Sequence, residues 1–147
     1  MADTEAQAQV RHVSRMFIAS AHLRVPFVAV VLRKGYGLGA MAMCAGGFHA
    51  TDATVAWPSG EFGAMGLEGA VRLGFRKELE ALPEGAERDA LFAKLLAKSY
   101  ANGEAMHMAA TLEIDAVIDP ADTRAWLARG LASAQVAPLG PRCIDTW

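Results

Sequence analysis

Apolar residues recur every three or four positions along the N-terminal segment of the chain. This spacing predicts an amphipathic helix over about residues 5–23. An unbroken apolar run rich in β-branched residues follows at 25–32, which is typical of a strand buried between two layers, and Pro26 fits near the first residue of such a strand. The apolar positions of the predicted helix are Ala6, Val10, Val13, Phe17 and Ala21.

Glycines are concentrated just after this apolar run. Residues 33–40 carry three of them, which predicts a tight turn. The short apolar segment 41–45 is typical of a buried helix, and Gly46 and Gly47 end it. The remaining pattern predicts strands at 54–57, 61–65 and 113–118 and helices at 66–82, 87–100 and 104–110.

The clearest helix start lies near the C-terminus. Asp119 is a candidate N-cap, Pro120 suits the first helical position, and Asp122 adds negative charge to the first turn. Short strands that alternate with helices indicate an α/β fold class in which helix is the larger share. The expected buried face of the last helix is Trp126, Leu127 and Leu131.

Composition and charge bear on the partners that the chain can have. The chain has 147 residues, which suits one domain, and its net charge of −2 argues against a nucleic-acid partner bound by phosphate neutralisation. The mean hydropathy of +0.21 is high for a small soluble protein. A membrane-spanning helix needs roughly 20 apolar residues, far more than the run at 25–32 supplies. We therefore expect no membrane partner, and the excess apolar surface indicates a homo-oligomer or a missing piece of chain.

The N-terminus and the cysteines bear on location. Residues 1–7 have neither a basic region nor an apolar stretch, so they do not resemble a signal peptide. Cys44 and Cys143 are too few for a disulfide framework and fit a reducing compartment. We expect a cytoplasmic protein, or a mitochondrial-matrix protein in a eukaryote.

The glycine turn at 33–40 is the strongest local signal for chemistry. Glycine lets backbone N–H groups approach a ligand closely, and a helix that begins at such a turn directs its unpaired N–H groups at an anion or oxyanion. The alternative is a tight strand-to-helix connection with no ligand. Gly35, Gly37 and Ala40 also fit a dinucleotide fingerprint, which we reject because the helix is too short and Asp52 precedes the next strand instead of ending it.

Other reaction classes have less support. The chain has no G-x-S-x-G motif, and Ser59 follows a proline in an ordinary turn. No metal site is expected, because the His and Cys residues are not at ligand spacing. The basic side chains of the 66–82 helix are interpreted as a solvated face or a contact for a phosphate. The His and Cys residues that are not at ligand spacing are Cys44, His49 and His107. The basic residues of the 66–82 helix are Arg72, Arg76 and Lys77.

Several segments together resemble the carboxyltransferase (beta) subunit of biotin-dependent acyl-CoA carboxylases, the propionyl-CoA, acetyl-CoA and methylcrotonyl-CoA carboxylase group. Their order and spacing are specific, and they extend to about residue 130. The segments are Arg11-His12, Val25-Pro26, the 31–37 stretch Val-Leu-Arg-Lys-Gly-Tyr-Gly, Ala56-Trp57-Pro58, the 65–71 stretch Met-Gly-Leu-Glu-Gly-Ala-Val, Arg76-Lys77-Glu78-Leu79, and 114–124.

The resemblance implies a crotonase-like (Clp protease/crotonase) α/β fold of repeated β-β-α units, of which this chain is a part. Residues 1–134 correspond to the back portion of the C-terminal carboxyltransferase domain, and 135–147 are expected to be an irregular tail. The N-terminal half, which holds most of the acyl-CoA site in the family, is outside the resemblance. The isolated chain is therefore expected to be inactive.

The implied reaction transfers CO2 from N1-carboxybiotin to the α-carbon of an acyl-CoA. In the family a second-half glycine turn supplies backbone N–H donors on the biotin side, and those positions match Gly39 and Ala40 here. Many relatives have Tyr-Gly-Gly-Ala, and this chain has one more residue between Tyr36 and Ala40, so Gly37 and Leu38 are alternative donors. Tyr36, Gly37, Gly39 and Ala40 are the expected biotin-binding positions.

The resemblance also implies cofactors and partners. Biotin is carried on a separate carrier protein or domain, and an acyl-CoA is the substrate. The expected partners are the N-terminal carboxyltransferase half, the biotin carboxylase and the biotin carrier subunit. Two alternatives stay open: a stand-alone crotonase-fold binding or assembly protein without catalysis, and a related acyl-CoA decarboxylase.

Overall fold

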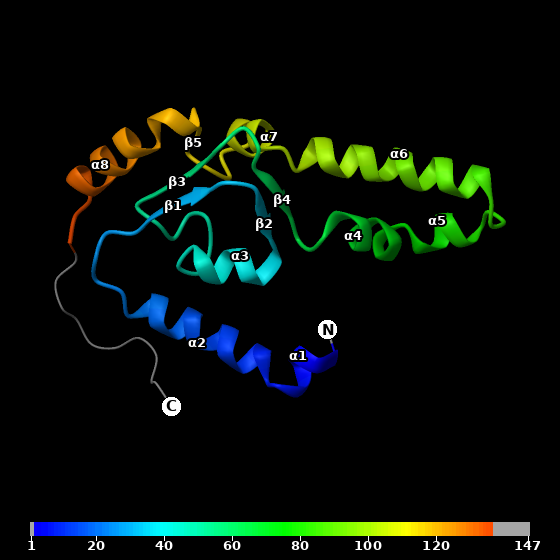
Figure 1. The fold of residues 1–147 in the computed structure, drawn as a ribbon, viewed down its shortest axis with the longest axis horizontal. Helices are drawn as coiled ribbons and strands as arrows, with labels where there is room; N and C mark the ends of the chain where they lie inside the picture. The colour runs from blue at the N-terminus through cyan, green and yellow to red at the C-terminus, as the bar shows by residue number, and fades with distance from the viewer. Residues whose placement is uncertain (1, 137–147) are drawn as a thin grey trace.

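The computed structural model describes residues 2–136, in which two small parallel sheets lie among helices (Figure 1). The three-stranded sheet is formed by β1 (Val28–Val31), β3 (Ala53–Ala56) and β5 (Ala116–Val117), and the two-stranded sheet by β2 (Lys34–Tyr36) and β4 (Glu61–Gly63). The helices are α1 (Ala2–Ala6), α2 (Gln9–Ala21), α3 (Gly37–Met43), α4 (Leu67–Gly74), α5 (Arg76–Glu80), α6 (Ala86–Asn102), α7 (Ala105–Ala110), the 3₁₀ turn η1 (Pro120–Asp122) and α8 (Thr123–Ser133).

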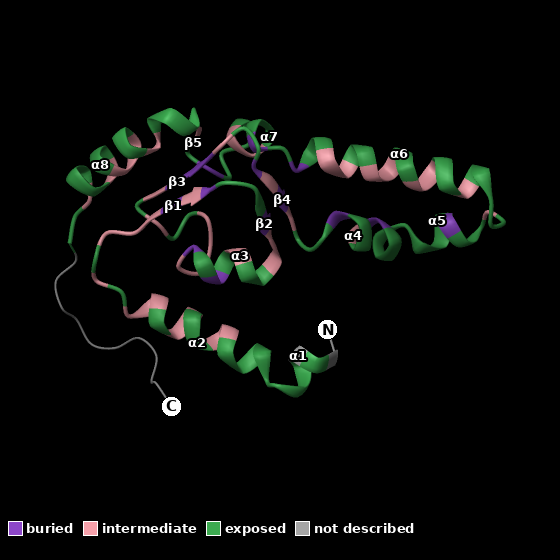
Figure 2. Cartoon of the chain, viewed as in Figure 1, coloured by how far each residue is buried: buried purple, intermediate pink, exposed green. Residues whose placement is uncertain are grey.

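Strand β3 is the centre of the larger sheet. It pairs in parallel with β1 on one side, in the register Val28↔Ala53, and with β5 on the other. Its residues 54–56 are at most 1% exposed, as expected for a parallel strand covered on both faces. Figure 2 shows this burial concentrated on the strands, whereas most helical surface is exposed. The predicted strands at 25–32, 54–57 and 61–65 are confirmed: the first and the last are shorter than predicted, and the middle one is shifted by one residue.

The smaller sheet corrects the prediction for residues 33–40. Lys34–Tyr36 is a strand, and it pairs in parallel with β4 in the register Lys34↔Glu61 and Tyr36↔Gly63. The helix predicted at 41–45 begins earlier, at Gly37. The partner of β2 lies about 27 residues away along the chain, so local pattern alone predicts only a turn.

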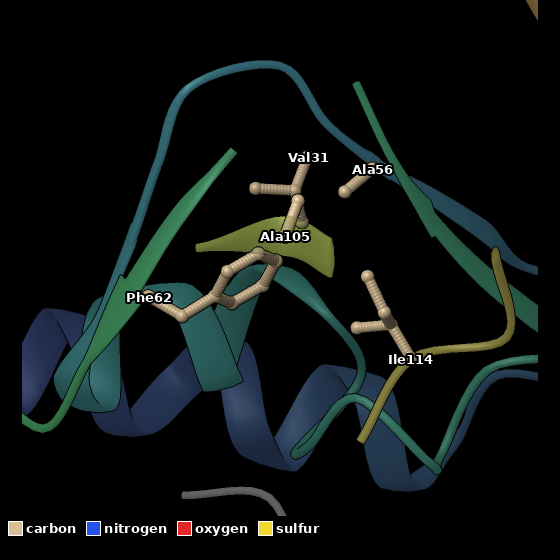
Figure 3. Close-up of a cluster of buried hydrophobic side chains, with 5 residues drawn as sticks. All are labelled: Val31, Ala56, Phe62, Ala105 and Ile114. Atoms are coloured by element: carbon tan, nitrogen blue, oxygen red, sulfur yellow. The ribbon is translucent and has the colours of Figure 1, made fainter. Parts of the chain in front are cut away.

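The hydrophobic core lies where the two sheets meet α7. Side chains from β1, β3, β4, α7 and the loop before β5 converge there (Figure 3). The ring of Phe48 packs edge-on against Phe62, with 5.2 Å between ring centroids. The cluster consists of Val31, Ala56, Phe62, Ala105 and Ile114.

Helices α4, α5 and α6 form an antiparallel hairpin that projects from the sheets, and we call residues 67–102 the arm (Figure 1). The helix predicted at 66–82 is broken within the arm. Phe75 has φ −111° and ψ 28°, outside the α-helical region, so α4 ends and α5 begins on either side of it. The helices predicted at 87–100 and 104–110 are confirmed as α6 and α7.

The predicted N-terminal helix is also broken. Ala8 is left-handed (φ 56°), which separates α1 from α2. Its expected apolar face is only partly covered: Val13, Phe17 and Ala21 are half-buried, whereas Ala6 is exposed and Val10 is 78% exposed. Helix α2 packs against α3, so the covered positions are those near the helix end closest to the sheets (Figure 1).

The C-terminal helix begins as predicted and packs differently. The Asp119 carboxylate accepts a hydrogen bond from the Ala121 N–H at 2.8 Å, but the first turn is 3₁₀. Gly130 faces Val28 of β1, and Leu131, one residue on, is 52% exposed, so the expected burial of Leu131 is wrong. Trp126 and Leu127 are half-buried.

Two further expectations concern the end of the chain and the membrane. The strand predicted at 113–118 is extended only at 116–117, although Ile114 and Ile118 are buried. Most of the predicted irregular tail, residues 137–147, lies outside the described residues. Among the helices of residues 2–136, none combines the length and apolarity that a bilayer span requires.

Candidate functional site

The glycine-rich segment 35–40 connects β2 to α3 and brings the expected site residues together. Gly35 is buried in β2, where a Cβ would lie 3.3 Å from the ring of Phe62. Gly37 has φ 56°, and a Cβ there would lie 2.7 Å from the Ala64 carbonyl oxygen, so both the backbone and the space require glycine. By contrast, a Cβ on Gly39 would meet no atom within 4 Å.

The first turn of α3 holds unpaired backbone N–H groups. Tyr36 is the N-cap, and in the described part of the chain no side chain caps this helix. An α-helix leaves the N–H groups of its first turn without intrahelical acceptors, and its first internal bond runs to the N-cap carbonyl. The N–H groups of Leu38 and Gly39 therefore have no intrahelical acceptor, the N–H of Ala40 bonds back to Tyr36, and the N–H of Gly37 faces the Gly63 carbonyl in the register of β2 and β4.

An apolar groove of about 460 Å³ opens beside these amides. Leu38 and Gly39 form one wall, and Leu38 is 67% exposed. The opposite wall comes mainly from α2, which packs against α3, with one residue from α1 (Figure 1). The residues of that wall are Glu5, Gln9, Val10, Val13, Ser14 and Phe17. The arrangement can receive a mostly apolar ligand whose polar end reaches backbone donors.

The Tyr36 side chain points away from this first turn, toward β4. Its hydroxyl donates a hydrogen bond to Glu61 Oε1 at 2.8 Å. Partial burial, followed by the bond to Glu61, raises the pKa of Tyr36 well above its ordinary value of 10.0, so the phenol stays protonated and keeps donating. The sequence gives no local signal for Glu61, because its approach to Tyr36 depends on the parallel register of β2 and β4.

The other candidate residues lie apart from this turn. The Ser59 hydroxyl donates to the Leu32 carbonyl at 2.6 Å, which makes it a turn residue. Cys44 is buried, and burial raises the pKa of its thiol. His49 lies 3.6 Å from Glu113 on the surface, and His107 is on α7. Among the described residues, no group of three His, Cys, Asp or Glu side chains could hold a metal.

The basic residues of the arm are engaged with their neighbours. The Arg72 guanidinium stacks over the ring of Phe92, 4.4 Å from its centroid. Arg76 Nε donates to Glu80 Oε1 at 2.7 Å. Together with the exposed Lys77 they form a solvated surface with local pairing.

Comparison with known sequences identifies a protein family. A family model described as the carboxyl transferase domain matches residues 2–140. The chain is 42% identical over 124 residues to the methylmalonyl-CoA carboxyltransferase 12S subunit of Propionibacterium freudenreichii subsp. shermanii, covering 83% of this chain and 23% of that protein. It is 36% identical over 133 residues to the biotin-dependent acetyl-/propionyl-coenzyme A carboxylase beta6 subunit of Mycobacterium tuberculosis, covering 90% and 28%. The chain thus spans about a quarter of the length of these curated relatives.

Comparison with solved structures points to the same family. A single-chain, multi-domain long-chain acyl-CoA carboxylase matches with a TM-score of 0.72 and 54% identity, over 86% of this chain and 12% of that one. The transcarboxylase 12S hexamer with methylmalonyl-CoA bound matches with a TM-score of 0.80 and 35% identity, over 96% of this chain and 27% of that one. The predicted family and α/β fold are confirmed: this chain belongs to the carboxyl transferase domain family and has part of its crotonase-like fold.

Proposed function

We propose that this chain is the biotin-facing part of a carboxyltransferase that moves CO2 from N1-carboxybiotin to the α-carbon of an acyl-CoA. The observation that carries the proposal is that the amides of Leu38 and Gly39, which have no intrahelical acceptor, lie beside an apolar groove. The relatives add support, since their names include biotin-dependent acyl-CoA carboxylase and methylmalonyl-CoA carboxyltransferase subunits.

The groove and its amides fit the biotin group in chemistry. Carboxybiotin, when bound here, would supply the CO2, and the loss of that CO2 would leave negative charge on its ureido oxygen. The amides of the α3 first turn would donate to that oxygen, while Val10, Val13 and Phe17 exclude water from its apolar part. Losing one such donor typically costs about 2.7–4 kcal/mol of barrier.

Within this proposal we place the donors at Leu38 and Gly39, because the N–H of Gly37, the other alternative, faces the Gly63 carbonyl in the register of β2 and β4. The Ala40 N–H has an acceptor in Tyr36 under the α-helical pattern, so Ala40 shapes the turn and its amide is not the donor. Gly39 leaves open space where a Cβ would stand, which suits close approach of a ligand.

The same proposal includes partners. The chain spans about a quarter of the length of its relatives, and we assign most of the acyl-CoA site to the N-terminal carboxyltransferase half. Within the described residues β1 pairs only with β3, and every residue from Phe27 to Gly35 lines a groove of about 410 Å³, so a strand of that half can lie beside β1. Biotin carboxylase, the biotin carrier and further copies of the same subunit complete the assembly. We place it in the cytoplasm, or in the mitochondrial matrix of a eukaryote.

The test is substitution of Gly39 by valine in the assembled enzyme. A valine side chain projects into open space, so the fold is retained, but it blocks the approach to the amides. We expect turnover to fall by at least about 100-fold with an unchanged circular dichroism spectrum. Gly74→Val is the matched control, since Gly74 also has no atom within 4 Å of a Cβ and lies on the arm. Unchanged turnover in Gly39→Val would contradict the proposal.

Omitting biotin from the same assay separates the alternative reaction. A carboxyltransferase needs biotin as the carboxyl acceptor or donor. An acyl-CoA decarboxylase would release CO2 from its substrate at the same rate with and without biotin. Biotin-independent release would therefore replace the proposed reaction by decarboxylation.

A further inference from the structure

The approach of the Tyr36 and Glu61 side chains is built into the smaller sheet. In the register of β2 and β4, Tyr36 lies opposite Gly63, and Glu61 lies two residues before Gly63, on the same face of the sheet. A Cβ on Gly63 would lie 3.6 Å from Cδ1 of Tyr36, so the tyrosine ring lies against the glycine backbone. From there its hydroxyl reaches Glu61 Oε1 at 2.8 Å.

Glu61 is itself held on both sides. Its backbone N–H donates to the Arg33 carbonyl next to β2. On the other side it forms an antiparallel bridge with Glu104, and the Phe62 N–H donates to the Gly103 carbonyl at 2.8 Å. The carboxylate is therefore attached to a strand that the end of α6 and the start of α7 keep in place.

Tyr36 is also the N-cap of α3, so its position sets where the helix begins. The next residue, Gly37, is left-handed and lies against the Ala64 carbonyl, which leaves the first turn little tolerance for a shift of Tyr36. The Lys34 ammonium lies 5.8 Å from the centre of the Tyr36 ring, on the same face as Glu61, and limits movement of the ring further.

We propose that Glu61 and Tyr36 are positioning residues: the hydrogen bond between them fixes the first turn of α3, and thereby aims the amides of Leu38 and Gly39 at the ligand. This inference rests on the proposed function for its catalytic consequence, but the fixing of the turn is a property of the chain itself. Tyr36 acts through Glu61 and the helix start, because its hydroxyl donates its hydrogen to Glu61.

The arm offers a matched control. Tyr100 donates to Glu68 Oε1 at 2.8 Å, the same bond between the same residue types at the same length, but it joins α6 to α4. Neither residue lines the groove beside α3. Glu68 and Tyr100 are near enough to Tyr36 to add to the rise in its pKa, but their bond joins two helices of the arm, so Tyr100→Phe removes an equivalent hydrogen bond and leaves the Tyr36–Glu61 bond in place.

The experiment compares Tyr36→Phe, Glu61→Ala, Glu61→Gln and Tyr100→Phe in the assembled enzyme. We expect Tyr36→Phe and Glu61→Ala to lower kcat about tenfold with the KM for acyl-CoA unchanged, because preorganised donors act on the transition state. Glu61→Gln keeps an acceptor oxygen and is expected to restore most of kcat. Tyr100→Phe is expected to behave like the wild type.

Hydrogen–deuterium exchange of the peptide covering residues 33–44 gives a readout that does not depend on turnover. We expect faster exchange in Tyr36→Phe and Glu61→Ala, and wild-type exchange in Glu61→Gln and Tyr100→Phe. Wild-type kcat and exchange in Tyr36→Phe and Glu61→Ala would overturn the inference, as would an equal loss in Tyr100→Phe. If the wild-type enzyme shows no biotin-dependent transfer, the proposed function fails, and exchange alone then decides whether Glu61 fixes the turn.

Discussion

Two glycines of one turn have different reasons to be glycine. Gly37 needs a left-handed backbone and lies against the Ala64 carbonyl, whereas Gly39 has an ordinary helical backbone and open space. The first is required by the fold, and the second is available for a ligand. A substitution of Gly37 is therefore expected to change stability, and a bulky substitution of Gly39 is expected to change activity.

Gly37→Ala is expected to destabilise the chain. The left-handed conformation alone costs an alanine about 1–2 kcal/mol, and its Cβ would also press on the Ala64 carbonyl. Urea unfolding followed by circular dichroism measures the loss. Gly39→Ala is the control and is expected to leave the free energy of unfolding unchanged or slightly raised. Equal stability of the two variants would show that the turn does not impose the left-handed residue.

Cys44 is expected to make stability depend on pH in the alkaline range. Burial raises the pKa of its thiol above the ordinary value of 9.0, so the folded chain holds the proton more tightly than the unfolded chain. The stabilisation is fully present below pH 9 and is lost as pH rises through the higher folded pKa. The free energy of unfolding should therefore fall more steeply above pH 9 in the wild type than in Cys44→Ala. Parallel curves for the two proteins would contradict this.

At the residue scale, local interactions can be predicted from the sequence, and interactions between residues far apart in the chain cannot. The importance of Gly37 and the N-cap role of Asp119 are local, and the sequence predicts both. The role of Glu61 depends on pairing between strands far apart in the chain, which no local pattern contains. The burial of Leu131 was predicted wrongly because the side of α8 that meets β1 is set by the packing of Gly130 on Val28.

Helices and strands with strong periodicity were predicted with nearly correct bounds, as α6 and β3 show. The errors occurred where tertiary contacts override the pattern. β2 exists because β4 pairs with it, and α4 and α5 are separated at Phe75, although the apolar spacing continues through both. Part of the candidate site lies in such a segment, so its geometry could not be predicted in full.

Asp119 is expected to stabilise the start of the C-terminal helix. Its carboxylate accepts the Ala121 N–H, so Asp119→Ala should lower the free energy of unfolding by about 1 kcal/mol. Asp122 is the matched control: it has the same charge, lies three residues on, and its side chain makes no cap hydrogen bond to α8. Thermal unfolding of both variants measures the difference. Equal losses would mean that charge near the helix, and not the cap, is responsible.

At the scale of the whole molecule, much apolar surface is uncovered. Val10, Leu38, Met43 and Met106 are each at least 65% exposed, and the chain spans about a quarter of the length of its relatives. Surfaces of this kind are normally covered by other protein. We infer that this apolar surface, which fits the positive mean hydropathy of the chain, packs against further polypeptide of the kind that the relatives carry.

The chain on its own is therefore expected to self-associate at micromolar concentration. Sedimentation velocity measures this directly, and addition of the polypeptide carrying the N-terminal carboxyltransferase half should replace the self-association by a defined complex. A well-folded monomer at the same concentration would contradict the expectation. Circular dichroism in the same buffer separates that outcome from unfolding.

Transfer of a labelled carboxyl group from methylmalonyl-CoA to free biotin tests the central claim most directly, since it is the reverse of the proposed reaction. We predict no transfer by this chain alone, no transfer by a polypeptide that carries the rest of the carboxyltransferase alone, and biotin-dependent transfer when the two are combined. The Gly39→Val variant should abolish the transfer in the combined enzyme. Transfer by the chain alone, or none by the two polypeptides combined, would contradict the account.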